Sequence, residues 1–143
     1  QQVQGMSEPG LILTPPATDD PKALDTDDGY LAASEIATLA LDADWVVLSA
    51  CNTAGPSGGE TSEALSGLAR AFIYAGTRAL LVSHWEVDSD AAVELTTRAF
   101  EMEARPSVGR AEALRVAMRE LIGKGDAHPS RWAPFVVVGE SRR

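Results

Sequence analysis

Residues 44–59 read DWVVLSACNTAGPSGG, an apolar run that ends at the only cysteine, Cys51, and passes directly into a glycine-rich segment. A short apolar run bounded by turn residues is typical of a buried central strand in an open α/β sheet. Such sheets place their ligands and catalytic groups beyond the carboxyl ends of the strands. We therefore expect the chemistry of this protein to lie near Cys51.

The chain around this stretch alternates between strand and helix patterns. A helical pattern over 62–75, closed by Gly76 as a C-cap, leads to a second buried strand over 78–84. This order predicts a βαβ unit with a right-handed crossover. Further strands are predicted over 11–14 and 132–139, and further helices over 31–41, 88–102 and 109–122. The predicted fold class is therefore α/β, a three-layer α/β/α sandwich with a mostly parallel sheet.

Besides the amphipathic helix over 62–75, two of the predicted helices have a clear apolar face. In the helix over 88–102, which Asp88 or Ser89 is expected to cap, the predicted buried residues are Ala92, Leu95, Ala99 and Phe100. In the helix over 109–122 they are Leu114, Ala117, Met118 and Leu121.

Length and composition bound the class of protein. The 143 residues are the size of one domain, 1–143, and the 45% hydrophobic content is that of a globular chain. No apolar run approaches the roughly 20 residues of a membrane span, and a net charge of −9 argues against a nucleic-acid partner. A single cysteine excludes an internal disulfide and a multi-thiolate zinc site, and favours the reducing cytoplasm. Because the chain starts QQVQGM, without an initiator methionine, we expect it to be N-terminally truncated.

Two binding motifs are suggested by the sequence but fail in detail. The acidic cluster between Asp19 and Gly29 resembles a calcium loop, but a loop starting at Asp25 puts Ile36 where the bidentate glutamate belongs. A solvated surface loop is favoured there. The glycines after Cys51 resemble a phosphate-binding turn, but the P-loop lysine is missing. We therefore predict neither a metal nor a cofactor.

Cys51 has two interpretations. A lone cysteine at a strand end is commonly a small buried hydrophobic residue. Its position at the predicted carboxyl edge, before small and flexible residues, instead favours a nucleophile, which needs a base to form its thiolate. His84 ends the neighbouring strand at the same edge and could either line the site or simply end the strand. His128 lies just outside the last strand and is predicted to be a turn or cap residue.

Five ordered motifs support a family assignment. They are DGYLAASEI at 28–36, VVLSACNTA at 46–54, LARAFIYAG at 68–76, VSHWEVD at 82–88 and WAPFVVVG at 132–139. In these motifs the chain resembles a CHAT domain, one of the bacterial caspase-like peptidases of clan CD that are often found behind TPR repeats. The resemblance runs from about Pro9 to Gly139.

The resemblance implies a caspase/separase-type fold and a Cys–His dyad that hydrolyses peptide bonds. Cys51 aligns with the nucleophile of the family, and its backbone N–H would be one oxyanion donor. In the family the catalytic histidine lies upstream of the cysteine, and no histidine precedes His84 here. The resemblance therefore implies that this histidine precedes Gln1 in the intact protein, and that this segment alone is poorly active.

The resemblance also implies what the site binds. The loop from His84 to Asp88, with Trp85 and Glu86, is expected to line the pocket for a protein or peptide substrate. A regulatory region upstream, such as TPR repeats, is the expected partner, and neither nucleic acid nor membrane is. Two alternatives stay open: a degenerate domain that only binds other proteins, and a hydrolase that pairs Cys51 with His84.

Overall fold

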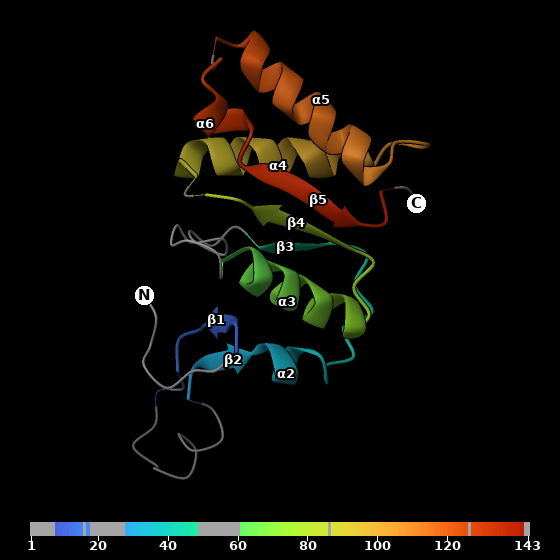
Figure 1. Ribbon diagram of the computed structural model, residues 1–143. Coiled ribbons are helices and arrows are strands. Elements are labelled where there is room, and N and C mark those ends of the chain that lie inside the picture. Colours follow the sequence, from blue (N-terminus) through green and yellow to red (C-terminus); the bar gives the residue numbers. More distant parts are fainter. Residues whose placement is uncertain are drawn as a thin grey trace.

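The computed structural model describes residues 8–15, 17, 28–48, 61–85, 87–125 and 127–141, with only the backbone at 61–66. These residues form two small sheets and a set of helices (Figure 1). The strands are β1 (Gly10–Ile12), β2 (Tyr30–Ala32), β3 (Val46–Leu48), β4 (Ala79–Ser83) and β5 (Phe135–Gly139). The helices are α2 (Ala33–Ile36), α3 (Thr61–Tyr74), α4 (Ser89–Glu103), α5 (Arg110–Gly123) and α6 (Pro129–Trp132). The predicted α/β class is confirmed.

The main sheet has the strand order β3-β4-β5. β3 and β4 are parallel, with Leu48 opposite Val82, as the predicted βαβ unit requires. β5 runs antiparallel to β4, with Phe135 opposite Ser83, so the sheet is mixed and the prediction of a mostly parallel sheet is wrong. The physical reason is that β5 begins beside the end of β4 and must run back along it. An apolar strand has the same residue pattern in either direction.

The core lies on both faces of this sheet because β4 is central and all five of its residues are buried. Leu80 and Val82 pack on one face with Leu68 and Phe72 of α3. Leu81 points to the opposite face, where it packs with residues of α4 and α5. Figure 1 accordingly shows α3 on one side of the sheet, and α4 and α5 on the other. This alternation follows from the two-residue period of a strand.

The end of α3 has the predicted glycine cap. Gly76 has φ +96°, a conformation that glycine adopts without strain. The N–H of Gly76 donates to the Ile73 carbonyl at 3.1 Å, and the N–H of Thr77 donates to the Phe72 carbonyl at 3.0 Å. This pair of bonds is the Schellman arrangement, which satisfies carbonyls at the end of a helix. It turns the chain directly into β4.

The predicted helix over 31–41 is mostly wrong. Tyr30–Ala32 forms β2, which pairs with β1 as an antiparallel ribbon, and only Ala33–Ile36 is helical. Glu35 marks the start of this short helix, because its side chain accepts a hydrogen bond from the N–H of Ala32 at 2.8 Å. Leu39 and Leu41, which were part of the predicted helix, are 40% and 38% exposed. The first residues of the predicted helix are therefore part of the ribbon. Its last residues are not helical, and the exposed side chains of Leu39 and Leu41 give them no buried apolar face. The predicted strand over 11–14 is β1, one residue earlier.

The buried face of α4 is rotated relative to the prediction. Its buried residues are Ala91, Leu95, Ala99 and Met102, while Phe100 is 43% exposed. The ring of Phe100 contacts the ring of Trp45, with centroids 4.7 Å apart and planes inclined by 56°. On α5 the predictions of Leu114, Ala117 and Leu121 are confirmed, and Met118 is partly buried.

Candidate active site at the carboxyl end of β4

Two of the predicted site residues, Cys51 and Glu86, lie outside the described residues. The structure does show the strands that precede them. β3 ends at Leu48 and β4 ends at Ser83, and the parallel pairing of Leu48 with Val82 puts both carboxyl ends at one edge of the sheet. This is the edge at which α/β proteins place their sites.

His84 and Trp85 are both exposed at this edge. The backbone N–H of His84 donates to the carbonyl of Pro134 at 2.8 Å, which extends the pairing of β4 with β5 by one bond. The rings of His84 and Trp85 are neighbours, with centroids 6.3 Å apart and planes inclined by 31°. Trp85 is 42% exposed, whereas Ser83, the last residue of β4, is buried. The chain therefore passes from the core to a pair of accessible rings immediately after Ser83.

Asp88 is the N-cap of α4, as predicted. Its Oδ1 accepts a hydrogen bond from the N–H of Ala91 at 3.1 Å, and the same oxygen lies 3.2 Å from Nη1 of Arg131. A carboxylate at a helix N-terminus satisfies a free N–H and complements the helix dipole. Asp88 thus fixes the end of the exposed segment, and its predicted contact with substrate stays a prediction.

His128 has the cap role that the sequence predicted. It is the N-cap of α6, and its Nδ1 accepts from the N–H of Ser130 at 3.3 Å and lies 2.7 Å from the Ser130 hydroxyl. Pro129 occupies the first turn of this helix, where its missing N–H costs nothing. The helix itself was missed, although a capping residue followed by proline is a known start signal.

Arg131 is the residue near this edge that sequence reasoning missed. It lies on α6 and reaches the cap of α4, far away in sequence, so no local pattern pointed to it. Figure 1 shows α6 beside α4 at the end of the sheet where β4 finishes. The side chain of Arg131 is 30% exposed and that of Asp88 is 50% exposed.

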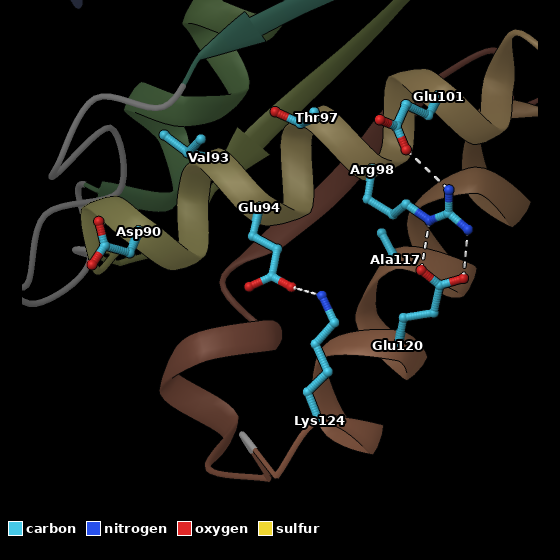
Figure 2. A pocket seen from close by; sticks show the side chains of 9 residues that line it. All are labelled: Asp90, Val93, Glu94, Thr97, Arg98, Glu101, Ala117, Glu120 and Lys124. Carbon is cyan, nitrogen blue, oxygen red and sulfur yellow. Dashed lines mark hydrogen bonds and ion pairs between the residues drawn. The ribbon is translucent and has the colours of Figure 1, made fainter.

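A hollow of about 410 Å³ lies between α4 and α5, and Figure 2 shows its lining. Arg98 reaches across it to Glu120, with N···O distances of 2.5 and 2.7 Å, and also pairs with Glu101 at 3.0 Å. Lys124 is paired with Glu94. Arg98 donates all of these hydrogen bonds. The bonds to Glu120 lower the pKa of Glu120 below its usual value, and the bonds to Glu120 and Glu101 raise the pKa of Arg98. These charged side chains are paired across the hollow and connect α4 to α5, so we interpret the hollow as the joint between the two helices. None of the predicted site residues lines it.

Within the described part of the chain, no group of three or more His, Cys, Asp or Glu side chains is arranged to hold a metal ion. The helices there include none that is long and apolar enough to cross a membrane.

Comparison with known proteins gives the family. Residues 4–140 match the CHAT domain. The chain is 35% identical over 115 residues to Tetratricopeptide repeat protein 28 of Mus musculus and 32% identical over 110 residues to its namesake in Homo sapiens. Each alignment covers 76% of this chain but only 4% of the relative, so the chain spans a small part of these proteins. Both relatives are mammalian and lend no support to the expected bacterial origin. No solved structure matches. The chain belongs to the CHAT domain family.

Proposed function

We propose that the intact protein is a cysteine endopeptidase and that Cys51 is its nucleophile. The observation that carries this proposal is the match of residues 4–140 to the CHAT domain, a family of caspase-like peptidases. The parallel pairing of β3 with β4 supports it, because the segments containing Cys51 and His84 follow strands that end at one edge. The caspase-type sandwich fold is part of the same proposal.

The mechanism follows from the chemistry of a thiol beside an imidazole. A histidine upstream of Cys51 removes the thiol proton, and the thiolate attacks the carbonyl carbon of a peptide bond. The N–H of Cys51 stabilises the negative oxygen of the tetrahedral intermediate. Collapse breaks the C–N bond as the imidazolium protonates the leaving amine, and water then hydrolyses the thioester. On this proposal the segment without that histidine cleaves poorly.

The segment from His84 to Asp88 is proposed to border the substrate. His84 and Trp85 present accessible rings at the edge, which suits contact with a peptide side chain. Glu86 belongs to the same segment, and Asp88 closes it by capping α4. Because His84 lies at the same edge, a second mechanism is also possible, in which the imidazole of His84 activates Cys51 in place of an upstream histidine.

Cytoplasmic location and control by an upstream regulatory region, such as TPR repeats, complete the proposal. The support for TPR repeats is the printed name of the two relatives, Tetratricopeptide repeat protein 28. The same name favours the second candidate function, a domain without catalysis that binds other proteins. That candidate predicts ordinary thiol reactivity in the full-length protein and unimpaired binding by a Cys51→Ala variant.

A peptidyl electrophile that alkylates active thiols, forming a thioether that water does not cleave, separates these possibilities. In the full-length protein we expect it to label Cys51 rapidly, as mapped by mass spectrometry. Substitution of the upstream histidine should abolish the labelling, whereas His84→Ala should retain it. Equal labelling with and without the upstream histidine would refute the dyad, and loss only in His84→Ala would assign the base to His84.

A matched control rules out unfolding as the cause of a lost signal. Arg115→Gln changes an exposed residue of α5 whose ion pair, with Glu112, lies within that helix. This variant should label like the wild type. Slow labelling in every protein, at the rate of a free thiol, would support the binding module.

A further inference from the structure

The two ends of the segment from His84 to Asp88 both contact residues 131–134, the stretch that leads from α6 into β5. At the first end, the N–H of His84 donates to the carbonyl of Pro134 at 2.8 Å. At the other end, Oδ1 of Asp88 lies 3.2 Å from Nη1 of Arg131. The conformation of the segment therefore depends on contacts that are remote in sequence.

Arg131 is carried by a short helix that is itself anchored. Nε1 of Trp132 donates to the carbonyl of Ala127 at 3.1 Å, and the Trp132 side chain packs against the core on the α4 and α5 side. The N–H of Ala133 donates to the carbonyl of Pro129 at 2.9 Å and closes the helical turn. The guanidinium of Arg131 thus extends from a fixed base toward the cap of α4.

The contact also balances charge. The Asp88 side chain is half exposed, and the guanidinium lies against the same oxygen that accepts the helix N–H of Ala91. If Arg131 became neutral, Asp88 would keep its cap but lose its nearby positive charge. The edge beside His84 and Trp85 would then be more negative.

We propose that Arg131 is a positioning residue for the segment from His84 to Asp88. Its positive charge also offsets the negative charge of Asp88, so this edge does not select basic substrate side chains. This inference rests on the proposed peptidase function. The proposed role does not require Arg131 to touch the reacting atoms. Arg131 acts through Asp88: it holds the position of Asp88 at the end of the segment, and it offsets the charge of the Asp88 carboxylate.

The test uses the full-length protein, four single variants and one double variant. Arg131→Gln removes the charge, Arg131→Lys keeps it, and Asp88→Asn keeps a capping side chain without the ion pair. Arg115→Gln is the matched control, because Arg115 forms an exposed ion pair with Glu112 within α5, at 2.6 Å. Hydrogen–deuterium exchange of residues 84–91 reports the position of the segment whether or not the protein cleaves anything.

Exchange over 84–91 should be about two- to fivefold faster in Arg131→Gln and in Asp88→Asn, as expected for the loss of a partly exposed ion pair. Arg131→Lys should restore most of the protection, and Arg115→Gln should match the wild type. Exchange in Arg131→Gln equal to that of the control would overturn the proposal.

Substrate preference supplies the second readout, one that a purely structural role would not move. For paired peptides that differ by a neutral or a lysine side chain next to the cut, Arg131→Gln should raise KM for the neutral peptide with kcat unchanged and should shift kcat/KM toward lysine. Adding Asp88→Asn to Arg131→Gln should remove that shift. An active Arg131→Gln variant with wild-type KM and preference would refute the role in specificity.

A wild type that shows no Cys51-dependent cleavage would refute the peptidase function instead, and the exchange data would still decide the positioning role.

Discussion

The two ends of β4 are built differently. At the amino end, the N–H of Arg78 donates to the carbonyl of Ala43 and the N–H of Glu140 donates to the carbonyl of Arg78, both at 2.9 Å. The side chain of Arg78 pairs with Asp42 at 3.5 Å and also with Asp44. At the carboxyl end, the chain leaves the sheet after Ser83 and exposes its next two side chains.

The difference assigns different roles to the two ends. The amino end is closed by backbone hydrogen bonds and close packing, so substitutions there act on stability. The carboxyl end has accessible rings and is positioned by the longer-range contacts of Asp88 and Pro134, so on the proposed function we expect substitutions there to act on substrate binding. The buried strand between them supports both ends.

The largest expected effect is at that strand. Leu81 is fully buried against α4 and α5, so Leu81→Ala should reduce the free energy of unfolding by about 2–5 kcal/mol in a urea titration. The control is Val93→Ala on the solvent side of α4, where Val93 is 65% exposed, and its effect should be within about 0.5 kcal/mol. Similar losses in the two variants would contradict the assigned core.

The next effect tests the amino end. Gly139 has φ +104°, and a Cβ there would lie 2.6 Å from the carbonyl oxygen of Arg78. Gly139→Ala should therefore destabilise the fold by about 1–3 kcal/mol while kcat/KM of the folded protein stays unchanged. Gly123→Ala is the matched control, because nothing lies within 4 Å of the added carbon at the end of α5. A loss of cleavage in folded Gly139→Ala would break the division between the two ends.

The opposite result is expected at the carboxyl end. Trp85 is 42% exposed, so Trp85→Ala should change the free energy of unfolding by less than about 1 kcal/mol. KM for peptide substrates should nevertheless rise severalfold, measured in the full-length protein. Tyr74→Ala, which removes an aromatic ring that is 80% exposed on α3, should change neither quantity. Unchanged KM in Trp85→Ala would remove this ring from the proposed substrate contacts.

The smallest expected effect concerns the joint between α4 and α5, away from both ends of β4. Arg98 lowers the pKa of Glu120 in the folded protein, from a usual value of 4.5, so near that pH the unfolded chain binds more protons. The stabilisation is therefore present above pH 4.5 and is lost as the pH falls below it. Glu120→Gln should make stability less dependent on pH in this range, as measured by thermal unfolding. Arg98→Gln should do the same, and a wild-type pH profile in both variants would contradict the pairing.

The sequence predicted those elements whose signals are local. The apolar runs of β3 and β4, the helical period of α3 and the glycine at its end lie within short windows, and each is confirmed. The capping role of Asp88 is also confirmed, because a cap bonds to the first turn of its own helix.

Apart from α6, which was missed although its start signal is local, the errors arise where contacts between distant segments determine the structure. β2 is a strand because β1 pairs with it, and β5 is antiparallel because the chain reaches the sheet beside the end of β4. The buried face of α4 depends on how α5 packs on it, so neighbouring apolar residues such as Ala91 and Ala92 could not be ranked from spacing alone. Arg131 contacts Asp88 from another helix and has no sequence signature.

Cleavage by Cys51 is the central claim, and one comparison tests it most directly. Full-length wild type and Cys51→Ala, matched for thermal stability, are incubated with a library of unstructured peptides, and new termini are identified by mass spectrometry. The proposed function predicts cleavage at a defined set of bonds by the wild type and none by Cys51→Ala. The same cleavage by both proteins, or none by either, would contradict it.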